Sequence, residues 1–249
     1  MLDISIISGL VAMFSWGIAD FIQSKVVRQM GSYKTMYIGN IVWIIFVLPF
    51  AFFISLKISI TNLILLFVGS VMQVFAIYNF YQSMKIGEVS IVTPISGSYS
   101  IITVLMLLLL LGQKLNLMTI SAIFILIIGI ILTSTDLKKI KHIHTVKGVK
   151  EAVIALLMWG SYFFFVEVVA KDITFFLHFP ATDGLTVFFY SGVFIGFSSL
   201  IFSILHKGQT KLRDLKKNNI FWFVLVAQLI YTVAWAVINY GVSVGNTAL

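Results

Sequence analysis

The chain has 249 residues, of which 60% are apolar and 10% are charged, and its mean hydropathy is +1.06. Soluble globular domains have about 45–50% apolar and about 25% charged residues, so the composition excludes a soluble domain and indicates a polytopic membrane protein. The net charge of +8 lies in short segments between apolar runs, as is usual for membrane topology and not for nucleic-acid binding, and the absence of cysteine excludes disulfides and thiolate metal sites.

Long, continuous apolar runs predict an all-α protein. A helical span needs about 20 apolar residues to cross a hydrocarbon core about 30 Å thick, and helices leave no backbone group unpaired in lipid. Strands of a membrane barrel would alternate in polarity instead. A ninth span would begin near Ser243, after eight full ones. The predicted spans are 4–22, 36–56, 62–84, 89–111, 117–134, 150–169, 184–205 and 219–241.

A basic linker at 135–149 separates two halves, 1–134 and 150–249, that align with each other in order. LVAMFSWG (10–17) aligns with VIALLMWG (153–160), pairing Trp16 with Trp159 at an offset of 143. Gly39 then pairs with Gly192 at an offset of 153, and Gly87 with Gly245 at 158. The offset only grows, as expected for a collinear duplication with longer loops in its second copy.

Positive charges predict the orientation. Fourteen of the 17 Lys and Arg residues lie in the odd-numbered loops, and short loops rich in these residues stay cytoplasmic. We therefore expect the odd loops inside and the N-terminus outside. With five spans to each half, the halves have opposite orientations, which is the inverted repeat of secondary transporters with a binding site near the midplane.

These features resemble the EamA-type branch of the drug/metabolite transporter superfamily over the whole chain. The resemblance is carried by Ala12-x-x-x-Trp16-Gly17, by the small-residue turn SMKIGEVSIVTPI after the third span with its Pro94, and by Gly129 in the fifth span. It implies ten helices in two five-helix halves, a central cavity, and alternating access for small metabolites, often amino acids or their relatives, usually exported. The chain departs from this pattern in its missing ninth and tenth spans. Family members are also often described with cytoplasmic termini, against the charge count, which we retain.

Asp20 is the first candidate for a binding residue. An Asp at a helix centre costs about 2.5–3.5 kcal/mol on insertion scales, so such residues are functional candidates. Asp20 shares a helical face with Met13 and Trp16, where it could bind a cationic group or take up a coupling proton. Alternatively it reaches the headgroup region and pairs with Lys25 or water.

The eighth span carries the clearest polar stripe. Lipid-facing surfaces do not carry amides, because an unpaired amide in hydrocarbon costs several kcal/mol. The repeat maps this stripe onto Gln73 and Tyr81 of the third span, where a second polar face of Tyr78, Asn79 and Gln82 competes. Interhelical hydrogen bonds, worth about 0.6 kcal/mol each, are the alternative to a cavity. The stripe is Gln228, Tyr231, Thr232, Trp235 and Asn239.

Trp16 and Trp159 lie well inside their spans, which favours cavity lining or packing over interfacial anchoring, and Tyr162 shares the face of Trp159. In the fourth span, Pro94 and Gly97 lie in a cluster of small residues. Proline kinks a helix and small residues let helices approach closely, so this segment serves either gating or plain packing.

Two features away from these spans' centres are interpreted as structural. Glu167 precedes Lys171 by four residues, which predicts an ion pair. The four histidines, His142, His144, His178 and His206, lie in loops without metal-ligand spacing.

The sequence predicts no enzyme, because it has no Walker loop, nucleophile elbow or HExxH motif. It predicts a secondary transporter that exports a small organic metabolite, an amino acid or related compound, through a central cavity. We expect a multi-pass protein of a prokaryotic plasma membrane, without cofactor, metal or nucleic acid; a coupling proton stays open. The alternative is a non-transporting membrane sensor or scaffold.

The chain ends at a position equivalent to the middle of its first half. NYGVSVGNTAL (239–249) is the second copy of YQSMKIGEVSI (81–91), so Leu249 corresponds to Ile91. Completing the second half requires a segment equivalent to 92–134. We expect the natural protein to continue beyond Leu249; the alternative is an eight-span protein.

Overall fold

The computed structural model describes residues 4–54, 57–112, 117, 120–121, 123–125, 128–129, 147–171, 173–174, 178–205 and 220–244. Within this part the regular secondary structure is helical apart from two short paired strands, β1 (Ile173–Thr174) and β2 (His178–Phe179). The predicted fifth span, 117–134, lies largely outside the described residues. Seven segments are long and apolar enough to cross a membrane: Ile4–Met30, Ser32–Phe52, Ile60–Ile86, Val89–Leu111, Val149–Ala170, Gly184–Leu205 and Ile220–Val244.

The first two spans differ from their predicted bounds. Helix α1 (Ile4–Met30) continues past the predicted end at 22, and α2 (Ser32–Val47) begins before the predicted start at 36. Polar residues after position 22 end the apolar run but not the helical hydrogen bonding. Gly31, with φ of 82°, instead separates the two helices, because this left-handed conformation is open to glycine at little cost. A 3₁₀ turn, η1 (Leu48–Phe52), extends α2.

The fourth span is divided in two by the predicted small-residue cluster. It consists of α4 (Val89–Gly97) and α5 (Tyr99–Leu111), with Ser98 between them. Pro94 cannot donate a backbone hydrogen bond, and the Ser98 hydroxyl donates to Pro94 O at 2.6 Å. The Ser96 hydroxyl likewise donates back to Val92 O at 2.9 Å. Such bonds to the preceding turn compete with the helical ladder and bend it.

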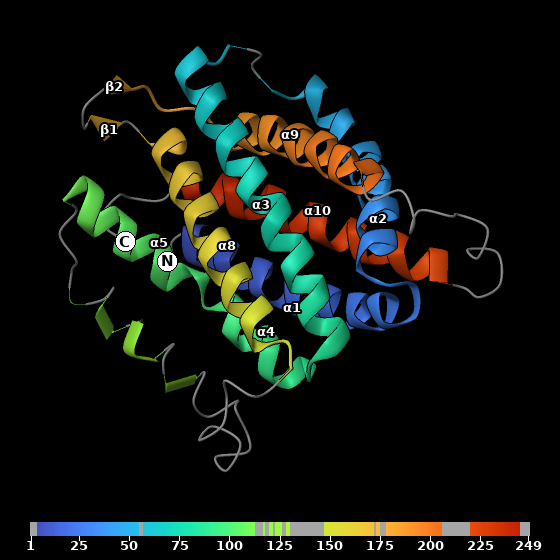
Figure 1. Ribbon diagram of the computed structural model, residues 1–249. Helices are drawn as coiled ribbons and strands as arrows, with labels where there is room; N and C mark the ends of the chain where they lie inside the picture. Colours follow the sequence, from blue (N-terminus) through green and yellow to red (C-terminus); the bar gives the residue numbers. More distant parts are fainter. Residues whose placement is uncertain are drawn as a thin grey trace.

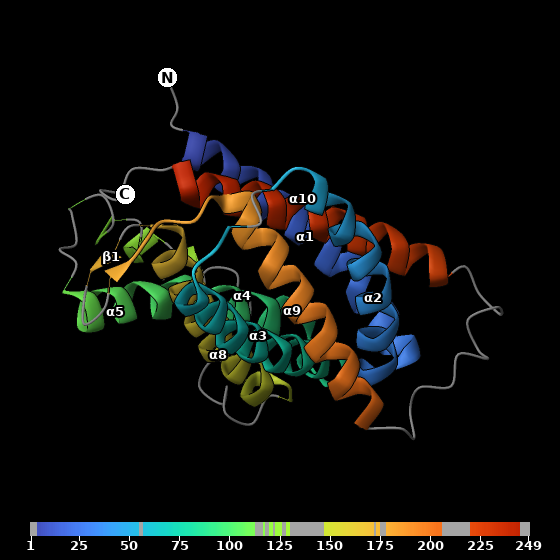
Figure 2. The same cartoon turned by 90° about the horizontal axis from the view of Figure 1, so that it is seen from above.

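The remaining helices are α3 (Ile60–Ile86), α8 (Val149–Ala170), α9 (Gly184–Leu205) and α10 (Ile220–Val244). Helix α1 packs along α10, α3 along α8, and α2 along α9, while α4 and α5 cover α8 (Figure 1). Seen from above, α1 and α10 form one layer and α3, α4 and α8 a second, with α9 crossing between them (Figure 2). The fold therefore interleaves helices from both ends of the chain.

Two glycines allow the start of α8 to meet the end of α3. A Cβ on Gly87 would lie 2.5 Å from Lys147 O, and one on Gly148 would lie 2.7 Å from Ser83 O. Gly148 also has φ of 86°, a conformation that side chains disfavour. The return of the chain after its basic linker is thus fixed at this junction.

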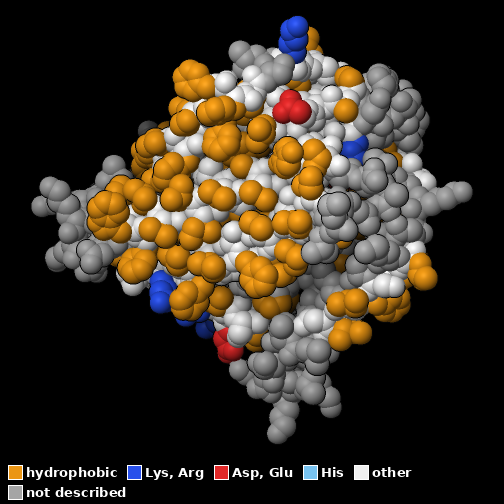
Figure 3. Space-filling model, turned by 180° about the vertical axis from the view of Figure 1, so that it is seen from behind, with side chains coloured by type: hydrophobic (Ala, Val, Ile, Leu, Met, Phe, Trp, Pro, Cys, Tyr) orange, Lys and Arg blue, Asp and Glu red, His pale blue; other side chains and the backbone are white. Residues whose placement is uncertain are grey.

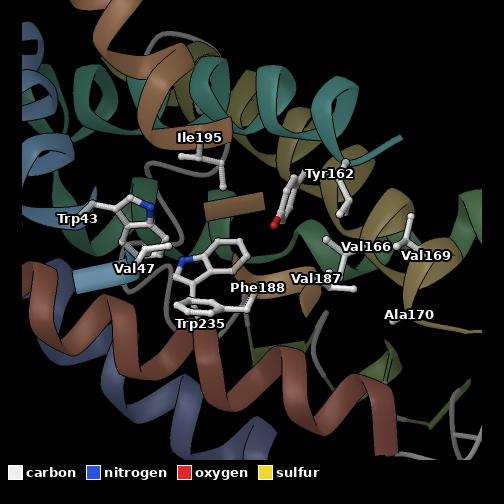
Figure 4. Close-up of a cluster of buried hydrophobic side chains, with 11 residues drawn as sticks. Trp43, Val47, Tyr162, Val166, Val169, Ala170, Val187, Phe188, Ile195 and Trp235 are labelled. Atoms are coloured by element: carbon white, nitrogen blue, oxygen red, sulfur yellow. The ribbon is translucent and has the colours of Figure 1, made fainter. Parts of the chain in front are cut away.

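Aromatic and aliphatic side chains fill the centre of the bundle. Trp235 of α10 lies between Trp43 of α2 and Tyr162 of α8, with ring centroids 6.4 and 5.3 Å away (Figure 4). The face on the side of α1 and α10 is covered mainly by hydrophobic side chains (Figure 3). On α1, Phe14 is 66% exposed while the amide side chain of Gln23 is fully buried. Apolar outside and polar inside is the arrangement required in lipid.

Candidate functional site

A cavity of about 500 Å³ lies between the helices. This volume is within the range of small-molecule sites, about 300–1,000 Å³. Residues of α1, α2, α3, α4, α5, α8, α9 and α10 line it, so it is built from both ends of the chain. The aromatic and polar lining residues are Trp16, Asp20, Asn40, Trp43, Gln73, Phe80, Tyr81, Thr93, Ser96, Tyr99, Trp159, Phe163, Gln228, Tyr231 and Trp235.

Asp20 is the one charged side chain among the lining residues in the described part of the chain. The Tyr231 hydroxyl of α10 donates a 2.5 Å hydrogen bond to Asp20 Oδ1 on α1. The ammonium of Lys25, the alternative partner considered for this carboxylate, lies 4.4 Å from the centroid of the Phe21 ring instead. The Asp20 carboxyl group is therefore oriented at the cavity wall by a neutral donor.

The polar side chains that line the cavity, such as Tyr81, are partly satisfied within the protein. Gln23 Nε2 donates to the Tyr81 hydroxyl at 2.9 Å, which joins α1 to α3. Gln73 Oε1 and Thr93 Oγ1 are buried and have no hydrogen-bond partner among the described residues. Buried polar groups usually have a partner, so these two oxygens offer hydrogen bonds to a ligand in the cavity.

An aromatic wall closes another side. The rings of Tyr99, Phe163 and Trp235 stack in sequence, with centroids 4.6 and 5.3 Å apart and planes within 9° of parallel. Trp16 meets all three edge-on, at 6.5, 6.3 and 5.8 Å. Both arrangements lie within the distances that aromatic pairs favour. The wall draws its members from α1, α5, α8 and α10.

Most of the residues singled out from the sequence come together here. Tyr162 is fully buried and does not line the cavity; its ring packs edge-on against Trp235. Asn239 also lies outside the lining, where its Nδ2 donates to Trp235 O at 2.8 Å. Pro94 is absent from the lining, although its neighbour Thr93 is part of it. The predicted residues that line the cavity are Trp16, Asp20, Gln73, Tyr81, Gly97, Trp159, Gln228, Tyr231 and Trp235.

The two polar faces of the third span have different surroundings. Gln73 and Tyr81 face the cavity. On the second face, Gln82 Nε2 donates to the Tyr78 hydroxyl at 2.9 Å, and the Tyr78 ring packs 5.3 Å from Phe202 of α9. That second face is engaged in packing between helices.

Sequence reasoning missed several lining residues, chiefly Asn40, Trp43, Tyr99 and Phe163. Phe163 follows Trp159 by four residues, so helical periodicity alone places the two on one face. Asn40 and Trp43 are three residues apart, and they follow Gly39, which the alignment of the two halves pairs with Gly192, by one and four residues. Tyr99 had no such signal, because it begins a new helix after the break at Ser98.

Other features do not contribute to this site. The predicted ion pair of Glu167 and Lys171 is confirmed, and neither residue lines the cavity. Within the described residues, no three His, Asp or Glu side chains converge as metal ligands. The side chains of the four histidines lie outside the described part.

A sequence model of the EamA-like transporter family matches residues 3–135. The matched range includes α1 to α5 and therefore Asp20, Gln73, Tyr81 and Tyr99 of the cavity. No curated protein matches the chain.

Proposed function

The chain belongs to the EamA-like transporter family, and on that premise we propose that it exports a small organic metabolite by alternating access through the cavity. The transported molecule occupies the space between the two halves, and the halves rock about it. We place the protein in the plasma membrane with its N-terminus outside, following the distribution of Lys and Arg.

The observation that carries this proposal is the cavity itself. It holds a carboxyl group and two oxygens without a hydrogen-bond partner among the described residues, within helices whose outer surfaces are apolar. Polar groups inside membrane helices are costly to insert and typically mark substrate or ion pathways. Helices that only packed against one another would need neither the space nor the unpaired groups.

The packing of the helices supports two structurally related halves. The first helix of one half packs on the third helix of the other in both directions, as α1 on α10 and α8 on α3. The second helices, α2 and α9, pack on each other. This pattern is unchanged when the halves are exchanged, as expected of an inverted repeat, in which rocking of one half against the other exposes the site to each side in turn.

Individual contacts between helices also correspond when the two halves are exchanged. In the register of the repeat, Gly39 corresponds to Gly192 and Ser70 to Gln228. A Cβ on Gly39 would lie 2.7 Å from Gln228 Nε2, so α2 closely approaches α10 at that residue. In the other half, the Ser70 hydroxyl donates to Ser191 O at 3.3 Å, one residue from Gly192. The two contacts thus join corresponding pairs of helices, α2 with α10 and α3 with α9.

Accessibility labelling tests the proposal without knowledge of the substrate. The chain has no cysteine, so Gln73→Cys and Gln228→Cys each introduce one thiol into the cavity. In inside-out and right-side-out vesicles, we expect a membrane-impermeant maleimide to label both variants from either side. Asn79→Cys, on the same helix as Gln73 but outside the cavity lining, is the matched control and should label poorly from both. Labelling from one side only would indicate a sensor or scaffold with a static pocket.

A further inference from the structure

The charge of the cavity is unbalanced. Asp20 contributes a carboxylate, and in the described part of the chain no Lys, Arg or His lines the cavity. The nearest basic residues of α1 are engaged elsewhere: Lys25 lies over the Phe21 ring, and Arg28 donates to Met84 O and Gly87 O at 3.2 and 3.0 Å. A negative charge in such a site favours a cation and disfavours an anion.

Aromatic rings lie one helical turn from Asp20 on α1 and from its hydrogen-bond partner Tyr231 on α10. Trp16 precedes Asp20 by four residues on α1, and Trp235 follows its hydrogen-bond partner Tyr231 by four residues on α10; all four line the cavity. Residues at this spacing are neighbours about 5–6 Å apart on a helix. A cation held by the carboxylate is therefore within reach of indole faces, which attract cations through their quadrupole.

The carboxyl group and an aromatic ring lie at corresponding positions of the two halves. The offset of 143 that pairs Trp16 with Trp159 also pairs Asp20 with Phe163. Phe163 lines the cavity and stacks between Tyr99 and Trp235. One half thus offers a charge where the other offers an aromatic ring, which suits a ligand with a charged end and a planar or apolar body.

The unpaired oxygens point to the same class of ligand. Gln73 Oε1 is buried and without a partner among the described residues, and as a carbonyl oxygen it can only accept hydrogen bonds. An ammonium group supplies N–H donors for it, whereas a carboxylate supplies none. A zwitterion such as an α-amino acid would bring its carboxylate into a wall without a cationic partner.

From this arrangement we propose that the site selects organic monocations, amines with an aromatic or apolar body, over zwitterions, anions and neutral analogues. The inference rests on the proposed transport function and names its substrate class. Asp20 holds the ammonium, Gln73 accepts one of its hydrogen bonds, and the aromatic wall covers the body of the ligand.

Four probes with one phenyl-ethyl body test the proposal in the purified protein: phenethylamine (cation), phenylalanine (zwitterion), 3-phenylpropionate (anion) and 2-phenylethanol (neutral). Titrations followed by intrinsic tryptophan fluorescence give the affinities. We expect phenethylamine to bind at least about tenfold more tightly than each of the others, because removing one partner of a buried charge pair weakens binding by more than about tenfold. In Asp20→Asn, phenethylamine should fall to the affinity of 2-phenylethanol, which itself stays unchanged.

Glu167→Gln is the matched control, because it makes the same carboxylate-to-amide change outside the cavity; it should keep the full preference. Asp20→Glu, which retains the charge, should keep the preference for the cation and covers the case in which Asp20→Asn does not fold. Equal binding of the four probes, no binding of any, or an Asp20→Asn variant that still prefers phenethylamine would overturn the inference. The maleimide labelling of the cavity is independent of these results and shows separately whether the transport proposal stands.

Discussion

Gly160 of α8 gives a sharp test of how the fourth span packs on the second half. A Cβ on Gly160 would lie 2.4 Å from Ile102 Cβ, 2.7 Å from Ile102 Cγ2 and 2.9 Å from Tyr99 O, all on α5. The Thr103 hydroxyl also donates to Gly160 O at 3.0 Å, which fixes the approach of the two helices. Because neither a branched side chain at its Cβ nor a backbone oxygen can yield easily, we expect Gly160→Ala to cost about 1–3 kcal/mol of overpacking.

The melting temperature of the purified protein measures this cost. In a protein of this size each kcal/mol corresponds to about 2–4 °C, so Gly160→Ala should melt on the order of 5 °C lower. Gly17, its equivalent in the repeat, has no atom within 4 Å of a built Cβ, and Gly17→Ala should show no loss. If the two variants melt together, α5 does not lie against α8 in the way described and the overpacking argument fails.

Three other variants test separate contacts. Gly196→Ala would place its Cβ 2.4 Å from an α2 side-chain carbon and should lower the melting temperature more than Gly39→Ala, which meets the end of a flexible amide. Asn62→Ala removes buried bonds of 2.9 and 3.0 Å to the segment before α9 and should cost about 1–3 kcal/mol in thermal unfolding, whereas Asn79→Ala, which loses a bond within its own helix, should cost less. Arg28→Lys cannot reproduce the two bonds to carbonyls at the end of α3, so amide hydrogen exchange there should become faster; an unchanged rate would contradict the capping role.

The number and order of the described spans followed from the apolar runs, because each helix must present apolar side chains to lipid over its whole length. The bounds of α1 did not. Hydropathy falls after position 22, yet the helix continues to Met30 because Gln23 is fully buried and bonded to Tyr81. The hydropathy of a segment shows that a residue such as Gln23 is polar, but not that another helix supplies its hydrogen-bond partner.

The polar stripe of α10 shows how far periodicity reaches in predicting a site. Gln228 and Tyr231 line the cavity, whereas Asn239, on the same stripe, donates to the carbonyl of Trp235. Lipid forbids an unpaired amide, but an amide can meet that requirement with a ligand, a neighbouring helix or its own backbone. The sequence shows that each amide needs a hydrogen-bond partner, and only the tertiary structure shows which partner it has.

Aromatic lining residues were harder to predict for a different reason. Phe163 lines the cavity, while Phe14 is 66% exposed on the outer surface. Both are apolar residues in an almost wholly apolar segment. Amphipathic periodicity identifies the buried face of a soluble helix because its other face is polar, and here the inner and outer faces do not differ in that way. The proposed repeat is a better guide, because its offset of 143 pairs Phe163 with Asp20.

The same correspondence separates the residues at contacts between helices, which we call the frame, from those that select the ligand. Gly39 approaches Gln228 between α2 and α10, and Ser70 bonds to Ser191 between α3 and α9, two helix pairs that correspond when the halves are exchanged. The proposed inverted repeat needs such correspondence, because each half would adopt in turn the conformation of the other. Asp20 and Phe163 occupy corresponding positions of the proposed repeat and both line the cavity, yet their side chains differ in chemistry. Under the transport proposal, this difference places a carboxyl group at one of the two positions and an aromatic ring at the other. Substitution of Asp20 should therefore change which ligand binds while the cavity still opens to both sides, whereas overpacking at the glycines of the frame should impair opening for every ligand alike.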